Sequence, residues 1–166
     1  MAIAMIDIET LDIAVTAKIL SIGVATDTGL RLYLELDVSS QGSRTESADT
    51  LKWWRAQSTA MPAGELPLYA ALLKLSDFLR TLKPTELWCK GPHFDIAILQ
   101  HAYGDMGTPW KYSQIRDLRT LKSEALRLGA DELKLVNSHH ALDDARNQLT
   151  EVQHYRNFMN SLRKEK

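Results

Sequence analysis

Two carboxylates, Asp7 and Glu9, directly follow the apolar run of residues 2–6. A continuous apolar run predicts a strand that is buried on both faces. Strand side chains alternate between faces, so Asp7 and Glu9 point to the same side, with their Cα atoms roughly 6–7 Å apart. Two buried like charges are costly unless a cation lies between them, and a divalent ion with oxygen ligands meets that need. The alternative is a strand that ends before Asp7 and leaves both carboxylates in a solvated loop.

Two further acids can reach the same place. Asp95 comes just after a Gly-Pro-His break that ends the strand predicted at 86–90. Asp144 lies within the apolar stripe of the last predicted helix, where a core residue is expected. It could instead stabilise the helix dipole by about 0.3–1 kcal/mol, but Asp143 lies off the stripe and meets that role better. The stripe consists of Ala141, Leu142, Ala145, Leu149, Val152, Tyr155 and Met159.

The elements that must position these acids follow from hydrophobic periodicity and turn residues. After the first strand we expect strands at 18–26, 30–36, 86–90 and 114–117. We expect helices around 51–54 and over 68–82, 95–103, 118–128 and about 140–162. The pattern predicts an α/β fold in one domain, residues 1–166. Its mixed five-stranded sheet has an antiparallel meander, parallel strands and helices on both faces.

Composition narrows the possible partners and compartments. The formal net charge is −1, so a nucleic-acid partner must be held by metal ions and a few placed cations rather than by a basic surface. The single cysteine, Cys89, excludes a disulfide framework or a multi-cysteine metal site. No basic leader and no apolar run near 18 residues is present, so we expect a cytoplasmic protein without a membrane span.

Three segments resemble, in order and spacing, the exonuclease motifs of the DEDDh (DnaQ-like) superfamily of 3′–5′ exonucleases. They are Asp7-Ile8-Glu9-Thr10, His93-Phe94-Asp95 and His139-His140-Ala141-Leu142-Asp143-Asp144-Ala145. The segments 44–57 and 115–121 look like the phage exonuclease A group, which includes bacterial 3′–5′ exoribonucleases. Pro92 and His93 depart mildly from the usual second motif but leave Asp95 in register. The resemblance covers residues 3 to about 150.

The resemblance implies a ribonuclease H-like fold and stepwise removal of nucleotides from the 3′ end of single-stranded RNA or DNA. Asp7, Glu9, Asp95 and Asp144 are expected to hold two Mg²⁺ or Mn²⁺ ions, and hard oxygen ligands favour these metals. The family spacing back from Asp144 selects His139 rather than His140 as the general base. The residues expected to contact substrate are Thr10, Leu11, Arg44, Trp54 and Arg116.

Other interpretations remain open at this stage. The chain could be a catalytically idle nucleic-acid-binding module of the same fold, although the acid and histidine positions of the motifs are all filled. It could be an oligoribonuclease-like enzyme acting on very short RNA. A ribonuclease H-type endonuclease also uses an acidic sheet but does not need the histidine motif. The sequence does not choose between DNA and RNA, and relatives suggest a homodimer.

Overall fold

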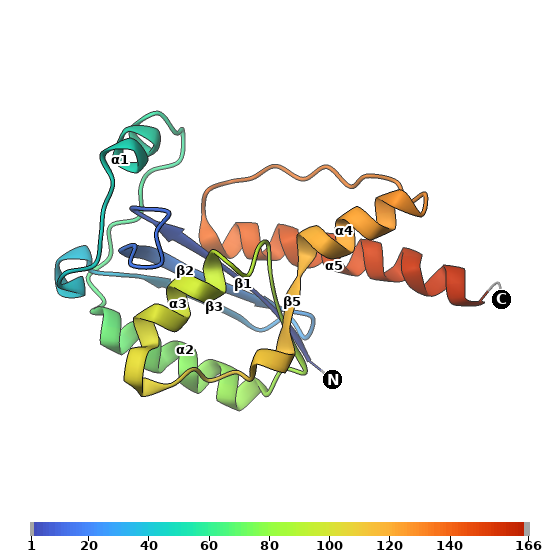
Figure 1. Cartoon of the computed structure of the whole chain (residues 1–166), viewed down its shortest axis with the longest axis horizontal. Coiled ribbons are helices and arrows are strands. Elements are labelled where there is room, and N and C mark those ends of the chain that lie inside the picture. Colours follow the sequence, from blue (N-terminus) through green and yellow to red (C-terminus); the bar gives the residue numbers. More distant parts are fainter. Residues whose placement is uncertain (1, 165–166) are drawn as a thin grey trace.

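Five strands form one mixed sheet in the computed structural model, which describes residues 2–164 (Figure 1). The order is β3-β2-β1-β4-β5. β1 pairs antiparallel with β2 and parallel with β4, β2 pairs antiparallel with β3, and β4 pairs parallel with β5. The predicted meander joined to parallel strands is therefore confirmed. The bounds are β1 Ile3–Thr10, β2 Ile19–Thr26, β3 Arg31–Glu35, β4 Glu86–Cys89 and β5 Ile115–Asp117.

Helices cover both faces of this sheet. α2 and α3 lie on one face and α4 and α5 on the other, while α1 stands out beyond the carboxyl end of β1 (Figure 1). The predicted helices are present, with α1 extending around the expected Trp53–Trp54 segment. The bounds are α1 Ala48–Arg55, α2 Leu68–Leu82, α3 Asp95–Tyr103, α4 Leu118–Arg127 and α5 Ala141–Lys164. Among residues 2–164, no helix combines the length and hydropathy needed to cross a bilayer.

The alternation of side chains along β1 decides which layer receives the acids. Ala4, Ile6 and Ile8 enter the apolar core beneath α2 and α3. Met5 enters the opposite core, beneath α4 and α5. Since Asp7 and Glu9 share the face of Met5, they continue that side of the strand toward α5.

A glycine lets α5 approach the sheet closely. Gly23 lies opposite Asp7 in the β1–β2 ladder. A Cβ atom at this position would lie only 2.2 Å from the carbonyl carbon of Ala141, in the first turn of α5. Without that Cβ, the helix start rests on the β2 backbone, which brings Asp144 beside the acids of β1.

A short 3₁₀ turn, Val38–Gln41, follows β3. Gln41 is buried beneath it, because its amide both accepts from the backbone N–H of Ile19 and donates to the Ile19 carbonyl. These bonds satisfy backbone groups at the start of β2, which begins at Ile19 rather than at the predicted position 18.

Candidate active site

The predicted acids and His139 line one cavity of about 210 Å³ beyond the carboxyl end of β1. β1, β4 and β5 run parallel, so the segments that follow them meet at one edge of the sheet. α3 brings Asp95 to that edge, and the first turn of α5 brings Asp144. The lining residues are Asp7, Ile8, Glu9, Lys90, Phe94, Asp95, Arg119, Asn137, His139, Asp144 and Gln148.

Hydrogen bonds hold the deepest acids in place. Asp95 is buried and accepts a hydrogen bond from the backbone N–H of Ile8, at 3.2 Å, which ties the start of α3 to β1. Gln148 donates from Nε2 to Oδ1 of Asp7, at 2.7 Å. Gln148 itself is buried, and its Oε1 accepts no hydrogen bond within the described residues. The side-chain amide of Gln148 therefore orients the Asp7 carboxylate.

Asp144 organises the loop that carries His139. Its Oδ1 accepts hydrogen bonds from the backbone N–H and hydroxyl of Ser138, at 2.7 and 2.8 Å. Its Oδ2 accepts from the backbone N–H of His139, at 3.0 Å. These bonds hold His139 at a φ of +55°, a left-handed conformation that is strained for a residue with a side chain.

Burial and mutual repulsion raise the pKa values of three acids in the cavity. Burial raises the pKa of Glu9 to about 8, and the charges of Asp144 and Asp95 add to the effect. The pKa of Asp7 lies well above its usual range because of burial and the charges of Asp95 and Glu9. Burial also raises the pKa of Asp95 to about 7, although the Ile8 N–H and the Arg119 charge oppose it. A bound cation would favour the ionised form of these carboxylates.

The donor set fits a divalent metal. Glu9, His139 and Asp144 each offer a ligand atom, and these three atoms lie within 4.8 Å of one another. Asp7 and Asp95 line the same cavity and add carboxylate oxygens. A site dominated by carboxylates suits Mg²⁺ or Mn²⁺. Divalent metal use therefore agrees with the geometry and with the raised pKa values.

The two neighbouring histidines point in different directions. His139 lines the cavity, and its Nδ1 lies 3.3 Å from the side-chain nitrogen of Asn137. Its ring also contacts Trp53 edge to face, with centroids 4.7 Å apart. His140 instead stacks on Tyr33 of β3, with ring centroids 4.3 Å apart. Of the two, the structure thus places His139 at the acids.

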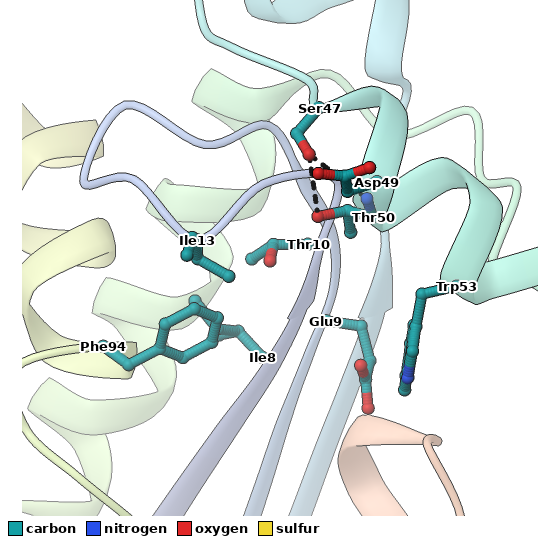
Figure 2. Close-up of a pocket in the computed structure, with 9 residues that line it drawn as sticks. All are labelled: Ile8, Glu9, Thr10, Ile13, Ser47, Asp49, Thr50, Trp53 and Phe94. Atoms are coloured by element: carbon teal, nitrogen blue, oxygen red, sulfur yellow. Dashed lines mark hydrogen bonds between the residues drawn. The ribbon is translucent and has the colours of Figure 1, made fainter.

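A larger pocket of about 540 Å³ adjoins the acidic cavity and shares Ile8, Glu9 and Phe94 with it. Figure 2 shows Phe94, Ile8 and Ile13 on one side of this pocket and Glu9 with Trp53 on the other. Polar side chains from the start of α1 form the far rim, where the Ser47 hydroxyl accepts from the backbone N–H of Thr50. The pocket is lined by Ile8, Glu9, Thr10, Ile13, Ser47, Asp49, Thr50, Trp53 and Phe94.

The structure corrects the expectation that Trp54 contacts substrate. Trp54 is only 3% exposed and packs with Leu11 and Leu20, while its Nε1 donates to the Thr10 carbonyl at 2.9 Å. Trp53, which is 40% exposed, occupies the pocket instead. Leu11, also expected to contact substrate, is likewise buried in this small core and lines neither cavity. Thr10 lines the pocket as expected.

Two predicted phosphate ligands are engaged elsewhere. Arg44 donates from Nε to the Ala17 carbonyl and from Nη1 to Nδ1 of His101, at 2.8 and 3.1 Å. Arg116 donates from Nη1 to the carbonyls of Ser113 and Ile115. Neither arginine lines the acidic cavity or the adjoining pocket. Their guanidinium groups are occupied by local acceptors, a constraint that sequence spacing does not reveal.

Sequence reasoning missed several residues that line the site. Gln148 could have been found, because it lies four residues after Asp144 and so shares its helix face. Lys90, which directly follows β4, was also missed, whereas Arg119 follows β5 within the 115–121 segment that the resemblance had already selected. The close approach at Gly23 had no local signal, because it depends on a helix more than 100 residues away.

Solved structures share this fold at low sequence identity. Two exonuclease I structures match 90% of the chain with TM-scores of 0.70 and 0.67 and 11% identity. The chain spans only 39–40% of those proteins. The nuclease domain of 3′hExo, a DEDDh family member bound to rAMP, matches 96% of the chain and is itself 92% covered. Its TM-score is 0.59 and its identity 13%. No curated protein sequence matches significantly.

The sheet order, the four acids in one cavity and the histidine before the last helix agree with the site that the three motifs predict. These solved structures confirm the predicted fold. More specifically, the chain belongs to the family of the 3′–5′ exoribonuclease Rv2179c-like domain, whose model matches residues 2–155.

Proposed function

We propose that this protein removes nucleoside monophosphates one at a time from the 3′ end of single-stranded RNA. The observation that carries the proposal is a single cavity, lined by Asp7, Glu9, Asp95, His139 and Asp144, that joins a larger pocket through Glu9. RNA is proposed because the family is described as an exoribonuclease and the similar 3′hExo domain is bound to rAMP.

The pocket in Figure 2 suits a terminal nucleoside. Ile13 and Phe94 offer an apolar wall on one side, and the indole of Trp53 offers a stacking surface on the other. Glu9 belongs to both cavities, so a nucleoside in the pocket would have its 5′-phosphate next to the acids. The terminal nucleoside and its 3′-hydroxyl would then occupy the pocket, an arrangement that suits exonucleolytic rather than internal cleavage.

We assign Asp7, Glu9, Asp95 and Asp144 as the residues that would hold two divalent ions. When bound, two divalent ions activate water, neutralise the phosphate and stabilise the departing oxygen. Gln148 keeps the Asp7 carboxylate aimed into the cavity, and the Ile8 N–H does the same for Asp95. The chain thus supplies a fixed set of carboxylates.

His139 is the proposed proton acceptor. Asn137 approaches Nδ1 through its side-chain nitrogen; the proposed role takes the amide in the opposite orientation, with its oxygen accepting from Nδ1–H, which leaves Nε2 free to take a proton from water. The edge contact with Trp53 and the hydrogen bond from His139 N–H to Asp144 fix the imidazole over the acids. His140 is held against Tyr33 and has no such access.

The test is cleavage of matched single-stranded RNA and DNA, labelled at the 5′ end, with Mg²⁺ or Mn²⁺. We expect a ladder shortened one nucleotide at a time, faster on RNA. A bulky 3′ block or a 3′ end buried in a duplex should stop it. Internal fragments would indicate an endonuclease, and no cleavage with either metal would indicate an idle binding module.

Substrate length and assembly are measured separately. An oligoribonuclease-like enzyme would prefer dinucleotides to chains of about ten nucleotides, whereas we expect cleavage of both. The homodimer suggested by the resemblance remains a prediction, which light scattering of the purified protein tests.

A further inference from the structure

Two cations line the acidic cavity at the side of β4 and β5. Lys90 directly follows β4, and Arg119 is the second residue of α4, directly after β5. Both share the cavity with Asp7 and Asp95. A cavity built to hold divalent metal does not need cations in its wall, so their presence points to an additional anion.

Neither cationic side chain is paired with a carboxylate in the part of the chain that the structure describes. Within residues 2–164, the Lys90 ammonium and the Arg119 guanidinium have no hydrogen-bonded or ion-paired carboxylate. Arg119 stays near enough to Asp95 to lower the pKa of that carboxyl. The guanidinium passes over Gly91, where an added Cβ would lie 3.3 Å from Nη1. The backbone at Gly91 has a φ of +114°, which favours glycine and leaves this space open.

The position of these cations relative to the proposed nucleoside pocket suggests which anion they meet. The pocket adjoins the carboxyl end of β1 and is lined by Trp53 of α1. Lys90 and Arg119 line the acidic cavity but not that pocket; Lys90 directly follows β4, and Arg119 lies at the start of α4. In Figure 1, α1 and α4 lie on opposite sides of the end of β1. A strand with its last nucleoside in the pocket would therefore leave the acids toward α4.

We propose that Lys90 and Arg119 bind the phosphodiester backbone on the 5′ side of the scissile bond. This inference rests on the proposed function, because it takes the nucleoside pocket as the 3′ end. Arginine and lysine are suited to phosphate, and such contacts position a strand without reading its sequence. They also give an acidic protein a local means of holding a polyanion.

A pair of substrates separates this role from balancing the acids. A p-nitrophenyl ester of a nucleoside 5′-monophosphate contains the terminal nucleoside and the scissile phosphate but no further phosphate. Lys90→Gln and Arg119→Gln should each lower kcat/KM on an oligoribonucleotide about tenfold, mainly through KM. Hydrolysis of the ester should fall much less than cleavage of the oligoribonucleotide in both variants, with the larger ester loss in Arg119→Gln, because the Arg119 charge also lowers the pKa of Asp95. Arg119→Lys should restore part of the loss, because it keeps the charge.

The matched control is Arg127→Gln at the other end of α4. Arg127 is exposed, pairs with Glu124 at 2.8 Å and lies outside the cavity. It should leave both substrates unchanged. An equal loss on ester and oligonucleotide would show that the cations act on the scissile phosphate or the acids, which overturns the proposal. Unchanged kcat/KM on the oligonucleotide also overturns it.

The salt dependence of direct binding tests the proposal even if the protein does not cleave either substrate. Each lost phosphate contact should make the slope of log Kd against log salt shallower by about 0.7. Fluorescence anisotropy of a labelled oligoribonucleotide with the Asp7→Asn background measures this without turnover. A wild type that binds but cleaves neither substrate contradicts the proposed function, yet the slopes still decide this inference. Slopes that match the background protein would refute it.

Discussion

The acids and His139 reach the same cavity by different structural means. Asp7 and Glu9 lie in β1, and Asp95 and Asp144 lie in the first turns of α3 and α5. His139 belongs to the connection 128–140, which contains no helix or strand. The acids are thus placed by the packing of regular elements on the sheet. The histidine is placed by individual contacts with Asp144, Asn137 and Trp53.

Substitutions in the cores and substitutions around His139 should therefore affect the protein differently. Cavity-forming changes in the two cores should unfold the protein, because the same packing positions the acids and maintains the fold. Contacts around His139 can be lost at much lower cost in stability, since loops open locally. The segment after α1 also belongs to this second group, because the Thr59 hydroxyl donates to the Ser138 carbonyl at 2.6 Å.

The largest expected effect comes from substitution of an acid of the cavity. Asp7→Asn should lower kcat more than about 10³-fold, since metal binding supplies several kcal/mol of charge stabilisation in the transition state. The fold should persist, and the metal-free melting temperature should rise because one of several clustered charges is removed. Circular dichroism and the ladder assay measure both. A fully active variant would contradict the metal-site assignment.

Substitution of His139 should give the next largest effect. His139→Ala should lower kcat by about 10²–10⁴-fold, the usual contribution of a general base, with little change in melting temperature. His140→Ala is the matched control and should retain most activity, although loss of its stacking on Tyr33 removes a packing contact. Both variants are compared at saturating Mg²⁺. A severe defect confined to His140→Ala would reverse the assignment.

Trp53 sharpens the comparison because it contacts His139 and also lines the nucleoside pocket. Trp53→Ala should lower kcat/KM by about 5–100-fold, through weaker stacking and a less fixed imidazole. Trp54→Phe is the control. It loses the hydrogen bond to Thr10 and should lower stability by about 1 kcal/mol while leaving KM near wild type. If Trp54→Phe alone raised KM, the correction from Trp54 to Trp53 would be wrong.

The smallest expected effect is a pH dependence of metal-free stability. The folded-state pKa values of Glu9 and Asp95, about 8 and about 7, exceed their ordinary values of 4.5 and 3.8. Between about pH 4 and pH 8 the folded state therefore retains protons that the unfolded chain has released. The free energy of unfolding should fall as pH rises through this window and then level off.

Thermal melts in a chelator from about pH 5 to about pH 9 measure this slope. Asp7→Asn should make it shallower, because one neighbouring charge is gone. Millimolar Mg²⁺ should raise the melting temperature most at the alkaline end, where the acids are ionised and bind metal. A metal-free protein that becomes more stable toward pH 8 would contradict the repulsion described for the acids.

The sequence predicted what depends on period and spacing. Alternation along β1 placed Asp7 and Glu9 on one face, and helical spacing placed Asp144 on the core side of α5. It wrongly selected Trp54 rather than Trp53 for the pocket, because the rotation of a two-turn helix depends on its packing against Leu11 and Leu20. Arg44 and Arg116 were misjudged because their acceptors are backbone carbonyls, which no residue pattern reveals.

Gly23 has a consequence for recognising inactive descendants of such an enzyme. A methyl group there would collide with the backbone of Ala141 and displace the start of α5 from β2. That shift would separate Asp144 from Glu9 while every acid of the three motifs stayed in the sequence. A relative with intact motifs but a larger residue at this position is therefore a candidate for a protein that keeps the fold without the activity. Lineages that lose catalysis need not lose a carboxylate first.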